Sequence, residues 1–314
     1  MTGTSDAPLP GIAAIVVTFH SGPVLKECLY ALCMLDSISE LIIVNNGNTP
    51  EVVEWLSEFA GTQETRRCEV LDGHGNVGFA RGINLGARAA TSECLLIINP
   101  DAVLHYQSLP ALEAARQTGT APCLVGGKLY YATGQEQRGG RRELLTLPRA
   151  LISFSGLSKL EGLIPAFRDL HREDDPEPEG PVPMPVVSGA LCYISAADYW
   201  SLDGLDEGYF LHVEDIDICR RVGEAGGQVI YTPLAGALHY GSTSKVSASF
   251  VEWNKAKGLS RYFRKFAKSP LERQIAGASL YFFAGLLIGR SASIRTALKV
   301  RQWMRDGLRA LRSR

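Results

Sequence analysis

The sequence predicts an α/β protein with a doubly wound, mostly parallel sheet and a basic, amphipathic helical tail at its C-terminus. Short β-branched or apolar runs alternate with helical patterns through the first third of the chain, as they do where helices join parallel strands. The 314 residues, 46% of them hydrophobic, are enough to bury a sizeable core in one large domain or two small ones.

The first two strand and helix pairs have clear boundaries. Residues 12–18 form a β-branched run, and a glycine and proline turn separates them from a helix with one apolar face over residues 25–32. Residues 41–44 form a second buried strand. A threonine and a proline then supply the cap and the first residue of a helix that we expect over residues 51–60.

The next two pairs have strands that end in polar turns. Residues 68–71 are the third expected strand, and a glycine-rich turn leads from them to a helix over 79–90. Residues 94–98 are a wholly apolar fourth strand that runs into Asn99-Pro100-Asp101, and a helix is expected near 108–117. Strands that alternate with helices in this way favour parallel pairing.

The regular alternation stops after Lys128. Residues 134–185 contain an acidic stretch and five prolines near their end, so we expect a mobile loop or lid there. Regular elements return with a strand over 186–195 and a helix after it. A helix over 214–225 ends at a pair of glycines, and a strand over 228–231 follows it.

Charge divides the chain into an acidic body and a basic tail. Residues 252–314 hold 15 Lys and Arg against 3 Asp and Glu, whereas residues 1–251 hold 17 against 30. We therefore expect a folded domain over 1–250 and a membrane-associating helical tail over 251–314, because clustered cations favour anionic lipid, nucleic acid or an acidic partner. Residues 275–288 carry no charge, but these 14 residues are fewer than the ~20 that span a bilayer. They are expected to lie in the membrane interface or to pack on the body.

The cysteines and the N-terminus indicate the cellular compartment. The seven cysteines are scattered through apolar stretches without a CxxC pair, which is typical of a reducing compartment. The first ten residues lack the basic and apolar features of a signal peptide. We therefore expect a cytoplasmic protein.

Polar residues follow each of the first four strands at the carboxyl end, where ligands of open parallel sheets bind. Together they outline one crevice. The residues are Thr18, Asn45, Asn46, Gly78, Asn99 and Asp101.

Residues 73–78 also satisfy the dinucleotide-binding fingerprint, with Asp101 at a suitable distance downstream. This pattern gives an alternative hypothesis, a nicotinamide-dependent oxidoreductase. Against it, the fingerprint normally opens the first strand and helix unit rather than the third, and it leaves the second half of the chain unexplained.

Three carboxylates lie within four residues at the start of the helix expected over 214–225. The helix dipole favours all three, and Asp217 can pair with Arg221 one turn later. Asp215 has no such local partner, so it is the better candidate for a general base, with Glu214 as the second candidate.

Eight short motifs follow one another over about residues 11–245. They are VVTFHS at 16–21, IIVNNGN at 42–48, GNVGFARGIN at 75–84, NPD at 99–101, SGA at 188–190, GLDEGYF at 204–210, EDID at 214–217 and HYGSTS at 239–244. Each motif alone is weak, but their order and spacing resemble those of the bacterial rhamnosyltransferase group within family 2 of the inverting glycosyltransferases.

The resemblance implies a GT-A fold and a metal-dependent donor site. Asp101 takes the place of an aspartate that binds Mg²⁺ or Mn²⁺ on the donor diphosphate, and His239 matches a second metal ligand of some relatives. Asp215 matches the base that deprotonates the acceptor hydroxyl in an inverting displacement. Structural alternatives stay open, because Asp101 can cap a turn and His239 can serve the fold alone.

The resemblance also places a set of residues on the donor nucleotide. Asn45 stands where the family usually has an aspartate that hydrogen-bonds the nucleobase. Asparagine keeps one acceptor and adds two donors, so thymine or uracil can still be read while the identity of the donor is open. Arg81 can instead cover a solvated helix face. The expected nucleotide-lining residues are Thr18, Asn46, Gly78, Arg81 and Asn84.

The leading hypothesis is transfer of L-rhamnose from dTDP-rhamnose, or of a similar sugar from a dTDP- or UDP-sugar, to a glycan or polyprenyl-diphosphate-linked acceptor. Such acceptors place the enzyme at the anionic inner face of the cell membrane. A third hypothesis is a catalytically silent nucleotide-binding scaffold, against which Asp101 and Asp215 both count. We expect no nucleic-acid partner, because the body offers no base-stacking platform.

Overall fold

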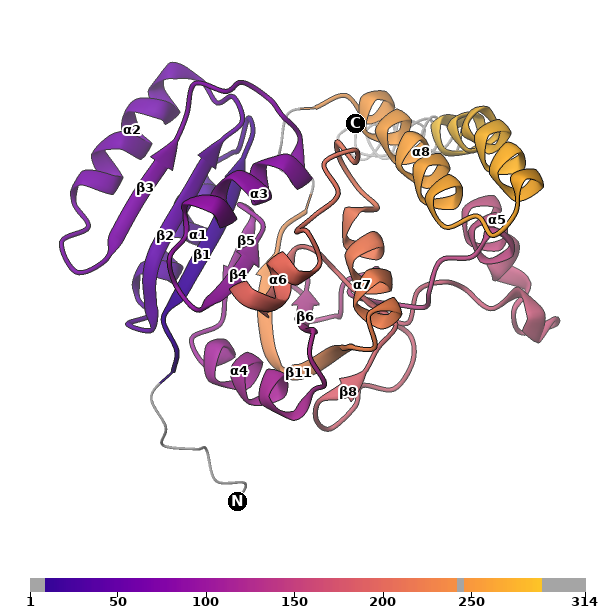
Figure 1. Cartoon of the computed structure of the whole chain (residues 1–314), viewed down its shortest axis with the longest axis horizontal. Coiled ribbons are helices and arrows are strands. Elements are labelled where there is room, and N and C mark those ends of the chain that lie inside the picture. The colour runs from indigo at the N-terminus through magenta and orange to yellow at the C-terminus, as the bar shows by residue number, and fades with distance from the viewer. Residues whose placement is uncertain (1–8, 242–245, 290–314) are drawn as a thin grey trace, which may run out of the picture.

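The computed structural model describes residues 9–241 and 246–289. A central sheet carries helices around it, and two long C-terminal helices lie side by side at the end of the molecule away from β3 (Figure 1). The predicted α/β fold class is confirmed.

The N-terminal part of the sheet is the parallel unit that the sequence predicts. Its strands follow the order β3-β2-β1-β4, and every neighbouring pair is parallel. The strands are β1 (Ile12–Thr18), β2 (Ile38–Asn45), β3 (Arg67–Leu71) and β4 (Cys94–Ile98). The helices are α1 (Val24–Cys33), α2 (Pro50–Gly61), α3 (Phe79–Ala89) and α4 (Ser108–Thr118).

The C-terminal part makes the nine-stranded sheet mixed. The strand β10 (Leu191–Ser195) runs antiparallel between β4 and β6 (Cys123–Tyr130), and β6 pairs in parallel with β11 (Gln228–His239). Two short strands, β5 (Ala102–Leu104) and β8 (Val182–Pro183), pair antiparallel with β11. Four strand pairs of this sheet are therefore parallel and four antiparallel.

The segment 134–185 contains ordered elements, and whether it moves as a lid stays a prediction. Its first strand pairs with the strand that starts the expected run 186–195. That run is interrupted at 188–190, where the chain turns before β10. The elements of the segment are β7 (Arg141–Arg142), α5 (Leu147–Ser155), η1 (Leu157–Leu160), η2 (Pro165–Phe167) and β8. The chain continues through β9 (Val186–Val187), β10, α6 (Ala196–Ser201) and α7 (Glu214–Glu224).

The start of the basic tail packs on the body. In α8 (Ala248–Lys265), Ala256, Leu259 and Tyr262 are buried in the same core as α7. A further helix over 270–289 buries Phe283 but exposes Tyr281, so its two sides meet different surroundings. Within the described ranges, no helix combines the length and hydropathy required to cross a bilayer.

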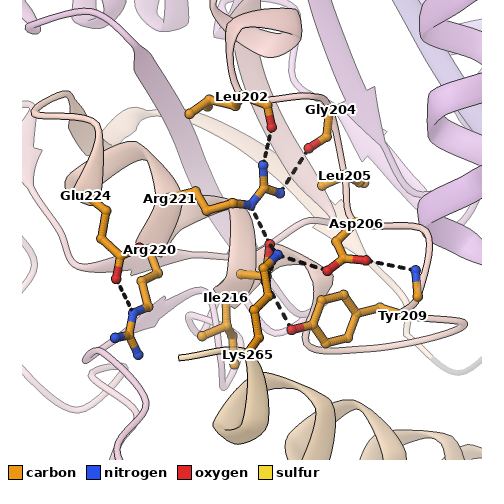
Figure 2. Close-up of polar contacts among 12 residues, drawn as sticks. Leu202, Gly204, Leu205, Asp206, Tyr209, Ile216, Arg220, Arg221, Glu224 and Lys265 are labelled. Carbon is orange, nitrogen blue, oxygen red and sulfur yellow. Dashed lines mark hydrogen bonds and ion pairs between the residues drawn. The ribbon is translucent and has the colours of Figure 1, made fainter. Parts of the chain in front are cut away.

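A buried ion network joins α8 to α7, and Figure 2 shows Arg221 and Lys265 converging there beside Asp206. Asp217 is fully buried and accepts from Arg221 Nε at 2.5 Å, which confirms the predicted pair. Lys265 Nζ lies 2.7 Å from Asp217 Oδ2 and 2.9 Å from Asp206 Oδ2. The hydroxyl of Tyr209 donates to Asp217 at 3.0 Å. The tail helix therefore helps to hold the first turn of α7, which carries the acidic cluster.

Candidate active site

The ends of β1 and β2 and the turn after β3 lie close together. The backbone N–H of Asn46 donates to Thr18 O at 2.9 Å, and the Asn46 side chain donates to Gly78 O, also at 2.9 Å. The side chains of Thr18 and Asn46 are both buried. The structure therefore brings Thr18, Asn46 and Gly78 together at one edge of the sheet.

Asn45 is committed mainly to its own turn. Its Oδ1 accepts from the backbone N–H groups of Gly47 at 3.2 Å and Asn48 at 3.0 Å. Its Nδ2 donates to Asp72 Oδ1 at 2.9 Å. The sequence reasoning did not single out Asp72, although it follows β3 directly and so lies at the same edge of the sheet as Asn45, the last residue of β2.

Gly78 meets protein rather than open space. It has a φ of 84°, and an added Cβ would lie 2.5 Å from Phe210 O. The N–H of Phe79 donates to that same carbonyl at 2.8 Å. In a dinucleotide site this first turn of the helix would face a pyrophosphate, so the contact with Phe210 counts against the oxidoreductase hypothesis.

Asn84 and Arg81 both make contacts with the 204–210 segment. The Asn84 amide donates to Leu205 O at 2.8 Å and to Glu207 Oε1 at 3.0 Å, and its oxygen accepts from Leu205 N–H at 3.0 Å. Arg81 lies 3.7 Å from Glu207 and is largely exposed. Asn84 therefore ties α3 to the second half of the chain, and its contact with nucleotide stays a prediction.

The predicted metal ligands adjoin one another. Asp101 Oδ1 lies 3.1 Å from His239 Nε2, and Asn99 Nδ2 lies 3.3 Å from the same nitrogen. The opposite ring nitrogen of His239 contacts the side-chain oxygen Oε1 of Gln137. The sequence reasoning missed Gln137, because it lies in the segment that was expected to be irregular.

These contacts indicate the tautomer of His239. Gln137 Oε1 can only accept, so the proton of a neutral imidazole lies on Nδ1 and the lone pair of Nε2 faces Asp101. With that tautomer, Nε2 and Asp101 Oδ1 present two lone pairs 3.1 Å apart, and a cation beside them would stabilise the arrangement. Neighbouring ligands of an octahedral Mg²⁺-like ion at about 2.1 Å lie roughly 3 Å apart, so the pair fits a divalent metal.

The described part of the chain contains no cluster of three or more His, Cys, Asp and Glu side chains with metal-binding geometry. Asp101 and His239 would thus be the protein's share of the ligands, with other oxygens coming from phosphate and water. Such a small protein share is usual for magnesium at nucleotide sites.

Asp215 lies at the N-terminus of α7 and has a partner distant in sequence. Arg142 Nη2, on β7, donates to Asp215 Oδ2 at 2.5 Å, and the N–H of Gly189 donates to the same oxygen at 3.1 Å. Burial acts to raise the pKa of Asp215, but the charge and hydrogen bond of Arg142 outweigh burial and lower it. Asp215 is therefore held as a carboxylate.

Glu214 has a different environment from its neighbour. Burial, together with the nearby charge of Asp215, raises the pKa of Glu214 to about 8. Its Oε2 has no hydrogen-bond partner among the described residues. Glu214 is thus largely protonated near neutral pH, which makes Asp215 the better proton acceptor of the two.

The turn before α7 has strained backbone that the tail supports. His212 and Val213 have φ values of 67° and 77°, which a β-branched residue such as Val213 rarely adopts. Gly258 of α8 packs under this turn, where an added Cβ would lie 3.0 Å from His212 O. The geometry of the acidic cluster consequently depends on α8.

The turn at residues 188–190 links the segment that carries Asp101 to the carboxylate of Asp215. Ala190 O accepts from the N–H of Asn99 at 3.1 Å, next to Asp101, while Gly189 N–H binds Asp215. Segment 137–142 also reaches both sides, through Gln137 on His239 and Arg142 on Asp215. The residues that could hold a metal and the residue that could accept a proton therefore share one backbone frame.

Comparison with protein-family models matches residues 13–175 to Glycosyl transferase family 2. The chain is 24% identical over 251 residues to the N-acetylglucosaminyl-diphospho-decaprenol L-rhamnosyltransferase of Mycobacterium tuberculosis, covering 73% of this chain and 76% of the relative. It is 22% identical to the rhamnosyltransferase WbbL of Escherichia coli, covering 72% and 82% respectively.

Two solved structures share the fold at low identity. GalNAc-T7 with UDP, GalNAc and Mn²⁺ superposes with a TM-score of 0.56 at 13% identity, and covers 88% of this chain, which spans 56% of that chain. The mannosyltransferase PcManGT of Pyrobaculum calidifontis, with GDP-Man and Mn²⁺, has a TM-score of 0.55 at 16% identity and covers 92% and 76% of the two chains.

Proposed function

Since its family model matches just over half of its length, the chain belongs to glycosyl transferase family 2, and we propose that it is an inverting hexosyltransferase. In this proposal it moves L-rhamnose from dTDP-rhamnose to a hydroxyl of a glycan or lipid-linked saccharide in cell-surface polysaccharide synthesis. The observation that carries the proposal is the turn 188–190, which hydrogen-bonds both to Asn99 beside Asp101 and to Asp215. The names of the rhamnosyltransferase relatives support the choice of sugar.

We assign the nucleotide of a dTDP- or UDP-sugar to the crevice at the ends of the first four strands. Asp101 and His239 would hold the diphosphate through a divalent cation, because they present two acceptors 3.1 Å apart. Magnesium or manganese would neutralise the negative charge that develops on the leaving diphosphate. Around the nucleotide we place the seven residues that the sequence indicated, Thr18, Asn45, Asn46, Gly78, Arg81, Asn84 and Asn99. Because Thr18, Asn46 and Asn84 are buried, they would support the crevice from beneath.

Asp215 would act as the base in a single displacement. The acceptor hydroxyl oxygen forms a bond to the anomeric carbon, the bond from that carbon to the diphosphate oxygen breaks, and the hydroxyl proton passes to Asp215. The lowered pKa of Asp215, which Arg142 maintains against burial, keeps the carboxylate available for that proton at neutral pH. Attack opposite the leaving group inverts the anomeric configuration.

The acceptor and the location are proposed from the chain's charge and from its relatives. The mycobacterial relative's name describes a polyprenyl-diphosphate acceptor, and such lipids lie in membranes. The basic C-terminal region would attach this enzyme, as a peripheral protein, to the anionic inner face of the cell membrane. Nucleic acid is not part of the proposal.

A donor screen tests the proposal. Thermal stabilisation of the full chain is measured with dTDP-rhamnose, other nucleotide sugars, NAD and NADP, each with and without manganese, because a ligand of the native state raises its stability. A manganese-dependent rise with dTDP-rhamnose, followed by transfer to a saccharide acceptor, is the expected result. Stabilisation by NAD with none by any nucleotide sugar would overturn the proposal.

A further inference from the structure

Exposed apolar side chains gather in two short segments. Of the sixteen large apolar side chains that the described residues expose, eight lie within 157–164 and 271–282, so they are concentrated rather than scattered. Leu163 is 81% exposed and Tyr281 is 76% exposed. The eight are Leu157, Leu160, Leu163, Ile164, Leu271, Ile275, Tyr281 and Phe282.

The two segments belong to one packed unit. Phe154, at the end of α5, contacts Phe283 of the 270–289 helix with ring centroids 6.1 Å apart. Figure 1 likewise places α5 beside that last helix. Phe263 of α8 stacks on Phe283 at 6.0 Å, which fixes the helix to the body. The exposed Leu157 lies three residues after Phe154, and the exposed Tyr281 lies two residues before Phe283.

Three cations that pair with no described carboxylate lie at the turn between α8 and the last helix. Arg264, Lys268 and Arg273 line a hollow there, and within the described residues none of the three forms an ion pair. By contrast, the neighbouring Arg261 and Lys265 are paired with Asp206. Residues 290–314, which follow the last helix, contain eight Lys and Arg against one Asp. Among the described residues, the turn therefore carries a net positive charge, because the three cations lie beside a single carboxylate, that of Glu272, which accepts from the Lys268 N–H at 2.6 Å.

We propose that segments 157–164 and 271–282, with the basic hollow between the last two helices, form one membrane-binding face whose occupant is an anionic bilayer surface. Apolar side chains mixed with cations suit the boundary between headgroups and acyl chains. Each Lys or Arg near such a surface strengthens binding by about five-fold. A second copy of the chain fits less well, since a twofold interface would bring these like charges against one another.

This face includes a part of the catalytic body as well as the tail. Segment 157–164 follows α5, and α5 in turn follows β7, the strand from which Arg142 contacts Asp215. Binding of both segments would fix the orientation of the body on the membrane and keep the 134–185 segment beside the bilayer. That consequence rests on the proposed function, because the orientation matters only if the acceptor is lipid-linked. Binding of the bilayer by this face does not depend on the proposed function.

Co-sedimentation of the full chain with vesicles tests the face. Vesicles of phosphatidylcholine alone are compared with vesicles of equal parts phosphatidylcholine and phosphatidylglycerol, over a range of salt. We expect the wild type to pellet with the anionic vesicles and less so as salt rises. Leu163→Ser with Ile164→Ser should weaken binding by about ten-fold, and Lys268→Gln with Arg273→Gln by about 25-fold.

Met34→Ser is the matched control, because Met34 is 83% exposed and lies on α1's C-terminal side, outside both segments. Circular dichroism checks that each variant is folded, and transfer to a water-soluble acceptor should be unchanged in all of them. Unaltered vesicle binding of the 163/164 variant would remove the body segment and overturn the proposal. The proposal would also be overturned if the wild type did not bind vesicles and light scattering showed a dimer that these variants dissociate.

Discussion

Replacing Arg142 with glutamine removes the cation whose Nη2 lies 2.5 Å from Asp215 Oδ2 and 3.0 Å from the carbonyl oxygen of Val187. An adjacent arginine lowers the pKa of an aspartate by about 1–3 units. In the wild type this effect outweighs burial, so the pKa of Asp215 is lowered. In the variant burial acts without that opposition, and the pKa should rise by about 1–3 units.

The assay is the pH dependence of kcat/KM with dTDP-rhamnose and a soluble acceptor. Because Asp215 must be ionised to accept a proton, the acid limb should move to higher pH by about the same 1–3 units in Arg142→Gln. Arg142→Lys should restore most of the wild-type limb. Arg149→Gln is the control, since Arg149 lies in the same segment but pairs with Glu143.

Stability gives a second measure with a definite sign. A buried carboxylate that loses its partner destabilises the fold by about 3–5 kcal/mol. Since the pKa of Asp215 is lowered in the folded wild type, the pair's stabilisation is present at neutral pH and is lost as pH falls through that folded pKa. The deficit of Arg142→Gln in urea unfolding should therefore shrink toward low pH. An unmoved acid limb in a folded variant would refute the assignment of Asp215 as the base.

Three further predictions follow from the site. Asp215→Asn should lower kcat by about 10²–10⁴-fold with donor binding nearly unchanged in calorimetry, and near-normal turnover would move the base role to Glu214. Asp101→Ala should weaken manganese-dependent binding of dTDP-rhamnose as well as turnover, and an unchanged manganese titration would remove Asp101 from the metal site. Lys265→Met should destabilise the chain by about 1–3 kcal/mol in urea, because Asp217 keeps Arg221 and Tyr209 as partners; no loss would show that the network does not anchor α8.

The parallel half of the sheet could be predicted because its signals are local. Each strand is a short apolar run, and each is followed by a turn and an amphipathic helix, so the boundaries lie in neighbouring residues. The direction of β10 could not be predicted in this way. It depends on how the chain returns after the 134–185 segment, and no periodicity encodes that path.

The contacts of the site residues could likewise be predicted only where both partners are close in the sequence. Asp217 and Arg221 lie one helical turn apart, so the sequence predicts their pair, and the structure contains it. Arg142 on Asp215, Gln137 on His239 and Lys265 on Asp217 are each separated by tens of residues, and spacing carries no information about them. The acidic residues themselves were predicted, but the cations that set their ionisation became visible only in the fold.

The C-terminal helices therefore cannot be treated as a detachable anchor. Lys265 neutralises part of the charge on fully buried Asp217, and Gly258 supports the strained turn at His212 and Val213, directly before Glu214. A chain cut near residue 250 would lose both contacts, so its lower activity or solubility would say nothing specific about membranes. Point substitutions on the exposed side of the last helix leave Gly258 and Lys265 in place. They separate attachment to a surface from the support that α8 gives the candidate base, and this distinction decides which variants can test each role.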